Sequence, residues 1–189
     1  MKNQNKELGF TLIELLVVII VLGILALVAN VKFVDFRRDG EIASVKTLAA
    51  SFKQSLTFAH TKWQITGGSG AMNDLAGFAG GVLDINSQGY PIGIDKRNPM
   101  GAPNNIGRGK QGCVSLWNTL LTDPPSISLA EIDNGSDFQA YRHKAETNPD
   151  AQSQCTYVLR TLGDTQGYQD ADIVINYNSV TGRVRALIN

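Results

Sequence analysis

The stretch from Leu15 to Ala29 constrains this chain most strongly, because it places fifteen apolar positions in succession while the rest of the sequence is polar and rich in glycine. Counted from Phe10, the apolar segment has twenty residues. As an α-helix it would be about 30 Å long, which matches the hydrocarbon thickness of a bilayer. We therefore expect a helix that can span a membrane.

A single carboxylate, Glu14, lies near the start of this segment. Burying a carboxylate in a bilayer costs roughly 2.5–3.5 kcal/mol even on permissive insertion scales. The charge therefore needs a compensating group. One possibility is the positive end of the helix dipole, which contributes about 0.3–1 kcal/mol to an acidic residue in the first turn.

The flanks of the apolar run argue against an ordinary secretory signal. Such a signal has a shorter apolar region of about 7–15 residues before a small-residue cleavage site, and Val28-Ala29-Asn30-Val31 matches such a site only weakly. Residues 1–9 are hydrophilic and include Lys2 and Lys6, which the positive-inside tendency holds in the cytoplasm. Two readings are left: a simple membrane anchor, or a segment that leaves the membrane to pack against copies of itself.

The sequence Gly9-Phe10-Thr11-Leu12-Ile13-Glu14, followed by the apolar run, resembles the class III leader junction of type IV pilins and related pseudopilins. The resemblance implies that a prepilin peptidase on the cytoplasmic face cuts between Gly9 and Phe10 and then methylates the amine of Phe10. It also implies an α+β pilin fold, in which a long N-terminal helix packs on a C-terminal antiparallel β-sheet.

The resemblance gives Glu14 a second possible partner. Cleavage creates an α-amino group at Phe10, with a reference pKa of about 7.7–8.0, so it is largely cationic at neutral pH. In the staggered packing of the family, the amine of an incoming subunit can approach Glu14 of a subunit already assembled. We assign Glu14 to the register and recruitment of subunits, with the helix-dipole role as the alternative.

We expect four segments in the chain: a leader at 1–9, a membrane and filament-core helix at 10–30, an amphipathic continuation at 31–66 and a globular domain at 67–189. Beyond the apolar run, hydrophobic residues recur every three or four positions, which predicts one buried face on a helix that continues to about Thr66. Gly67-Gly68 then offers a stop. The residues of the stripe are Ile42, Val45, Leu48, Phe52, Leu56, Ala59 and Trp63.

Residues 67–112 hold twelve glycines and predict a long irregular connection between the helix and the sheet. A hairpin is expected around Asn86-Ser87-Gln88-Gly89, and Gly89-Tyr90-Pro91 is similar to a tripeptide of mannose-sensitive haemagglutinin pilins. Gly107 to Gly112 matches the dinucleotide-binding pattern G-x-G-x-x-G. No buried strand precedes it, however, so we read it as an ordinary glycine loop.

Residues 113–189 predict a short helix and an antiparallel sheet. Apolar residues from Cys113 to Leu121 have helical spacing, and Trp117 is expected in the core. Strands are expected at 138–141, 156–162, 173–177 and 183–188, the last pair joined across 179–182. Because an exported chain meets oxidising conditions, we expect Cys113 and Cys155 to form a disulfide; two free thiols are the alternative.

No catalytic or cofactor-binding set is predicted. His60 and His143 lack an accompanying nucleophile pattern, and the 17 basic and 17 acidic residues balance, which gives no indication of a nucleic-acid partner. Some pseudopilins hold calcium in a region comparable to the loop with Asp164, Asp170 and Asp172. The alternation of an EF-hand is absent there, so calcium stays a hypothesis and no metal site is predicted.

The resemblance as a whole implies a structural subunit of a type IV pilus, most similar to the mannose-sensitive haemagglutinin kind, that serves attachment. Expected partners are other pilins, the prepilin peptidase and N-methyltransferase, the inner-membrane assembly platform and, before assembly, membrane lipid. The precursor is expected in the inner membrane with a cytoplasmic N-terminus, and the assembled subunit in a cell-surface pilus. The alternative functions are a pseudopilin of a type II secretion system and, less in keeping with the sequence, a membrane-anchored enzyme.

Overall fold

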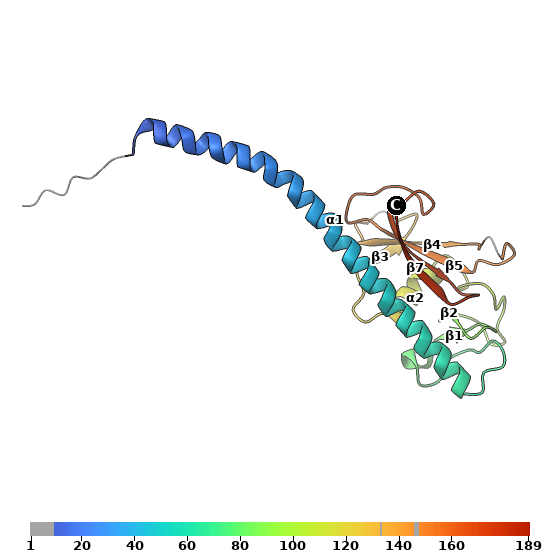
Figure 1. Ribbon diagram of the computed structural model, residues 1–189. Helices are drawn as coiled ribbons and strands as arrows, with labels where there is room; N and C mark the ends of the chain where they lie inside the picture. Colours follow the sequence, from blue (N-terminus) through green and yellow to red (C-terminus); the bar gives the residue numbers. More distant parts are fainter. Residues whose placement is uncertain (1–9, 133, 146–147) are drawn as a thin grey trace, which may run out of the picture. The chain divides into compact units, whose positions relative to one another are not determined.

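The computed structural model describes residues 10–132, 134–145 and 148–189; the side chains of residues 28–35 lie outside this description (Figure 1). One long helix, α1, runs from Leu12 to Ile65. The chain divides into two compact units, residues 1–41 and residues 42–189. The long helix and its end near Thr66 confirm the periodicity argument.

The end of α1 is fixed by a backbone turn. Gly67 adopts a left-handed φ of 80°, and the Gly68 amide donates to the carbonyl oxygen of Trp63 at 3.0 Å. Glycine suits both positions, because a left-handed φ strains other residues and a Cβ on Gly68 would overlap the Trp63 ring. The predicted stop at these two glycines is therefore confirmed.

The core of the second unit forms around the apolar stripe of α1. Phe52 is fully buried, and its ring lies 5.6–6.4 Å, centroid to centroid, from the rings of Trp117, Tyr157 and Tyr177. These aromatic residues come from helix α2 (Gly112–Leu120) and from strands β5 and β6 of the sheet. The stripe prediction is confirmed, with Ile42 and Leu48 at its partly buried margin.

The sheet has five strands in the order β3-β4-β5-β6-β7. Their bounds are β3 Ile127–Leu129, β4 Phe138–His143, β5 Gln154–Leu159, β6 Ile173–Asn178 and β7 Arg183–Ile188. The pairs from β4 to β7 are antiparallel, as expected, and β6 and β7 are joined across residues 179–182. The fold is the predicted α+β class.

One strand departs from the prediction. β3 was not expected, and it pairs with β4 in parallel, so the sheet is mostly antiparallel with one parallel pair at its edge. The carboxylate of Asp137 accepts hydrogen bonds from the backbone amide and the hydroxyl of Ser126 at 2.9 and 2.7 Å. This pair holds the starts of β3 and β4 side by side, and two strands that begin at the same edge must run parallel.

The glycine-rich connection contains a short 3-10 turn at Ala79–Gly81 and the expected hairpin, with β1 at Asp84–Ile85 and β2 at Pro91–Gly93. The side chain of Asn86 organises its turn by accepting the backbone amide of Tyr90 at 2.9 Å. Tyr90 in turn stacks on His60 of α1 with centroids 4.7 Å apart. The hairpin is thereby attached to the end of the long helix.

Candidate functional site

The first turn of α1 is closed by a reciprocal pair of side chains, Thr11 and Glu14. The Glu14 oxygen Oε2 accepts the backbone amide of Thr11 at 2.9 Å and its hydroxyl at 2.8 Å. The Glu14 amide donates back to the Thr11 hydroxyl oxygen at 3.3 Å. This arrangement is a capping box, which satisfies amide groups that the start of a helix leaves without partners.

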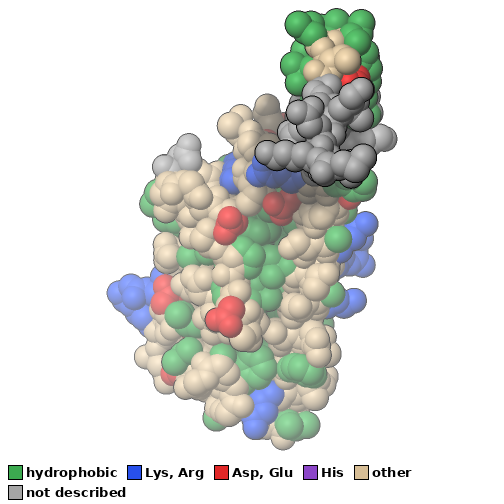
Figure 2. Space-filling model, turned by 90° about the vertical axis from the view of Figure 1, so that its left-hand side faces the viewer, with side chains coloured by type: hydrophobic (Ala, Val, Ile, Leu, Met, Phe, Trp, Pro, Cys, Tyr) green, Lys and Arg blue, Asp and Glu red, His purple; other side chains and the backbone are tan. Residues whose placement is uncertain are grey.

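The side chains that follow form a surface that is apolar on every side of the helix. Every large hydrophobic residue from Phe10 to Leu27 is between 45% and 84% exposed. Figure 2 shows hydrophobic side chains gathered over this part of α1. Removing one such side chain from water contributes about 1.5–3 kcal/mol, and a helix that is hydrophobic all round is normally buried. Lipid or other helices are the surroundings that this segment fits.

Among the described residues, no helical stretch is both long and apolar enough to count as a membrane span.

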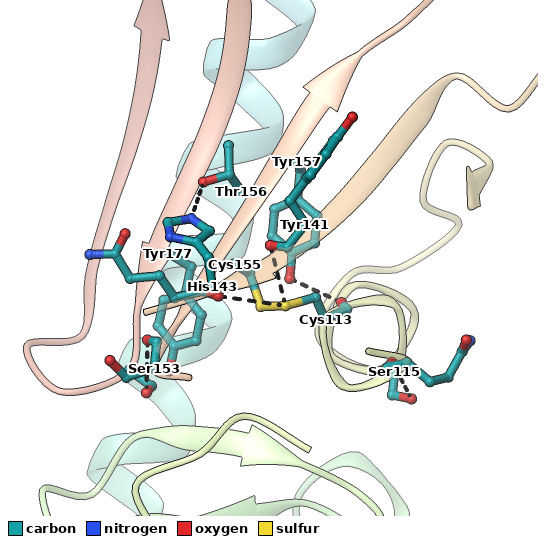
Figure 3. The surroundings of a disulfide bond; sticks show 12 residues. Cys113, Ser115, Tyr141, His143, Ser153, Cys155, Thr156, Tyr157 and Tyr177 are labelled. Carbon is teal, nitrogen blue, oxygen red and sulfur yellow. Dashed lines mark hydrogen bonds between the residues drawn. A yellow bond between two sulfur atoms is a disulfide. The ribbon is translucent and has the colours of Figure 1, made fainter. Parts of the chain in front are cut away.

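The two cysteines form the expected disulfide, which links α2 to β5 (Figure 3). Cys113 and Cys155 are both fully buried, and their Cα atoms lie 5.6 Å apart. The hydroxyl of Tyr157 donates to the carbonyl oxygen of Cys113 at 3.0 Å, beside the aromatic core. The bond therefore joins the short helix to the centre of the sheet.

The two histidines take part in packing. The Nδ1 atom of His60 lies 3.0 Å from the Gly89 carbonyl oxygen. The Nε2 atom of His143 lies 2.8 Å from the Thr156 hydroxyl oxygen, and burial lowers the pKa of His143 below its ordinary value. Among the described residues, neither histidine belongs to a group of three metal-ligating side chains.

The loop with Asp164, Asp170 and Asp172 is stabilised by hydrogen bonds from its backbone amides to the Asp164 carboxylate. The Oδ1 atom of Asp164 accepts the amide of Gln166 at 2.7 Å, and Oδ2 accepts the amide of Asp172 at 2.8 Å. Arg160 lies 3.7 Å from Oδ1. The residues that the structure describes include no group of three metal-ligating side chains.

The G-x-G-x-x-G segment is a turn that leads into α2. Gly107 has a left-handed φ of 58°, and a Cβ on it would press against the backbone of Gly112. These glycines are needed for close approach of the chain to itself. The segment has no βαβ surroundings, since the strand nearest before it, β2, belongs to the antiparallel hairpin.

Comparison with known proteins agrees with the geometry of the N-terminal segment. Residues 4–30 match the family described as the prokaryotic N-terminal methylation motif. A type IV major pilin of Neisseria gonorrhoeae is 32% identical over 58% of this chain and 67% of its own length. The chain belongs to the type IV pilin family. A fimbrial protein of Moraxella nonliquefaciens is 40% identical to this chain over 29% of this chain and 35% of its own length. No solved structure matches this chain.

Membership of this structural family confirms that the pilin is not an enzyme. The finer resemblance to mannose-sensitive haemagglutinin pilins finds no support in the relatives named above. Of the predicted site residues, Gly9 lies outside the described part of the chain, and Phe10 is exposed, two residues before α1 begins at Leu12. The sequence reasoning missed the capping box, although its signal, a threonine followed three residues later by a glutamate, is present in the sequence.

Proposed function

We propose that this pilin is made as an inner-membrane precursor, is cut between Gly9 and Phe10, and polymerises through its N-terminal helix into a surface filament that serves attachment. In this proposal residues 1–9 are the leader, 10–30 the membrane and filament-core helix, 31–66 its amphipathic continuation and 67–189 the globular domain. The observation that carries the proposal is the helix surface from Phe10 to Leu27, which is apolar on all sides and exposed in the single chain.

Glu14 can serve the capping box and a neighbouring subunit at once. Both hydrogen bonds from Thr11 end on Oε2, whereas Oε1 accepts no hydrogen bond from any described residue. Oε1 is thus available to the methylated amine of Phe10 in a neighbouring subunit. Opposite charges attract more strongly away from water, although their desolvation takes back part of the gain. We assign Oε1 of Glu14 to the register between subunits.

Three substitutions separate the capping role from the register role. Glutamine at the third helical position also completes a capping box, so E14Q keeps the cap and removes the charge. E14L removes both, and T11V removes the hydroxyl part of the cap while keeping the charge. Each variant is co-expressed with the wild-type chain, and its fraction in sheared filaments is measured by mass spectrometry.

The register role predicts that E14Q and E14L are both depleted at least tenfold from filaments, while T11V is incorporated within about twofold of wild type. Normal incorporation of E14Q together with loss of E14L and T11V would assign Glu14 to capping alone. Equal membrane levels of all four chains, measured on the same cells, exclude a defect in insertion.

The cleavage site is tested by substituting Gly9. G9V should leave uncut precursor in the inner membrane, because we propose that the peptidase accommodates only a small residue before the cleaved bond. G23A is the matched control: it adds one methyl group at a position with no neighbouring atom within 4 Å. Intact mass distinguishes chains with and without residues 1–9, and a normally cut G9V would contradict the assigned junction.

A pseudopilin of a type II secretion system is the second candidate, because the same N-terminal segment serves both classes. The relatives that are named a major pilin and a fimbrial protein favour the pilus. The tripeptide Gly89-Tyr90-Pro91 remains the only feature in favour of the mannose-sensitive haemagglutinin subclass. Loss of surface filaments from a deletion strain supports the pilus; loss of protein export with filaments intact supports the pseudopilin.

A further inference from the structure

A cavity of about 270 Å³ lies between the glycine-rich connection and strand β4. Four cationic side chains line it, Lys96, Arg97, Arg108 and Arg142, and no carboxylate is among its lining residues. Basic and acidic residues are equal in number over the whole chain, so this concentration of positive charge is local. Such a concentration of like charges is unfavourable for the protein alone, because neighbouring cations repel one another.

Arg142 is the least satisfied of the four. Its side chain is half-buried in β4 and makes no hydrogen bond or ion pair with any described residue; its Nε atom is buried without a partner. A buried donor without an acceptor costs about 1–3 kcal/mol, and more when the group is charged. Burial lowers the pKa of Arg142, and the charge of Asp95 partly opposes that change.

The other side of the cavity is held in place by three hydrogen bonds. Asp84, which is 1% exposed, accepts the backbone amide of Lys96 at 2.9 Å. The ammonium group of Lys96 donates to the carbonyl oxygen of Ala102 at 3.0 Å. Asp95 lies nearby, and its carboxylate accepts the backbone amide of Arg108 at 3.3 Å. The cavity is therefore formed in advance, with four cations near the two carboxylates of Asp84 and Asp95.

We propose that this cavity is a binding site for a tetrahedral oxyanion, the phosphate or sulfate group of a small monoester. The planar guanidinium groups of Arg108 and Arg142 can each give paired hydrogen bonds to two oxygens of such a group. The volume corresponds to about nine water molecules. A phosphate or sulfate group of five heavy atoms fills part of the cavity and leaves room for the attached alcohol. This binding goes beyond the filament function and does not depend on that function.

The test is calorimetric titration of the full-length processed pilin in detergent, at constant ionic strength adjusted with chloride. The probes are inorganic phosphate, inorganic sulfate, glucose 6-phosphate and glucose 6-sulfate, so that the free ion and the monoester are compared directly. Both monoesters should bind, at least as tightly as the corresponding inorganic ion. Binding of the inorganic ions alone would overturn the monoester assignment.

R142Q should weaken binding at least tenfold. The matched control is R183Q/R185Q, which removes two exposed arginines of β7 that line a different groove and should change binding less than twofold. Equal weakening in both variants, or no heat beyond that of chloride with the wild type, would overturn the proposal.

Thermal unfolding gives a second readout. Saturating monoester should raise the Tm of the wild type and of R183Q/R185Q, and leave the Tm of R142Q unchanged. Should R142Q fail to fold, R108Q at an exposed position replaces it and should weaken binding several-fold; unaltered binding there would overturn the site.

Discussion

Removing the disulfide by the double substitution C113A/C155A should destabilise the second unit strongly. The two cysteines are 42 positions apart, so the bond closes a loop of 43 residues. In the chain-entropy description, such a loop restricts the unfolded chain by about 4 kcal/mol at 25 °C. Alanine is chosen because both positions are fully buried, and a serine hydroxyl there would add a desolvation cost.

The measurement is equilibrium unfolding of the full-length processed pilin by urea, followed by tryptophan fluorescence, to which Trp63 and Trp117 both contribute. Trp117 is the more buried of the two. Its ring is fully buried and lies 4.7–4.8 Å, centroid to centroid, from those of Tyr157 and Phe138. When the free energy of unfolding falls by about 2 kcal/mol for each 1 M of urea, a loss of about 4 kcal/mol of stability lowers the unfolding midpoint by about 2 M urea. The slope of the free energy of unfolding against urea concentration should also become steeper, because an uncrosslinked unfolded chain exposes more surface.

The reducing agent TCEP is the internal control for this prediction. It should shift the wild-type curve toward that of the double variant and leave the double variant unchanged. A loss below about 1 kcal/mol would refute the reasoning and would mean that the unfolded loop is already compact. A shift of the double variant in TCEP would show that the change reports something other than the disulfide.

Three further substitutions probe the second unit in the same urea assay. G182A places a Cβ against the Tyr90 ring, whereas G135A has the same left-handed backbone and open space; G182A should cost about 1–3 kcal/mol more than G135A, and equal costs would contradict the contact. F52A should cost about 3–5 kcal/mol, because it empties the centre of the aromatic cluster; a cost below 2 kcal/mol would mean that the core closes over the gap. Because burial lowers the pKa of His143, the unfolded chain takes up a proton first as the pH falls below about 6.5. The wild type should therefore lose more stability than H143Q between pH 7.5 and 5.5, and parallel losses would exclude this role.

The features that local sequence patterns could predict are those that depend on spacing. The stripe that includes Val45, Phe52 and Trp63 was readable because helical periodicity alone decides which face is buried. The end of α1 could be predicted because Gly67 and Gly68 follow shortly after its last apolar residue, Ile65. The disulfide needed only two cysteines and an oxidising compartment, with no alternative pairing to exclude.

The features that could not be predicted depend on contacts between distant residues. β3 has only three residues, too few for their alternation to predict a strand. Its position is set by the hydrogen bond between Ser126 and Asp137 and by the Trp117 indole, which donates to the carbonyl oxygen of Pro125 at 3.0 Å. The cationic cavity likewise joins Lys96 and Arg142, which are far apart in the sequence. Neither arrangement leaves a local signal.

The central claim is that the apolar helix beginning at Phe10 becomes the core of a filament once the leader is removed. Intact-mass measurement of the subunits in sheared surface filaments tests it most directly. We expect a chain of residues 10–189 with one added methyl group on the amine of Phe10. Filaments that lack this chain, or that contain it with residues 1–9 still attached, would contradict the claim.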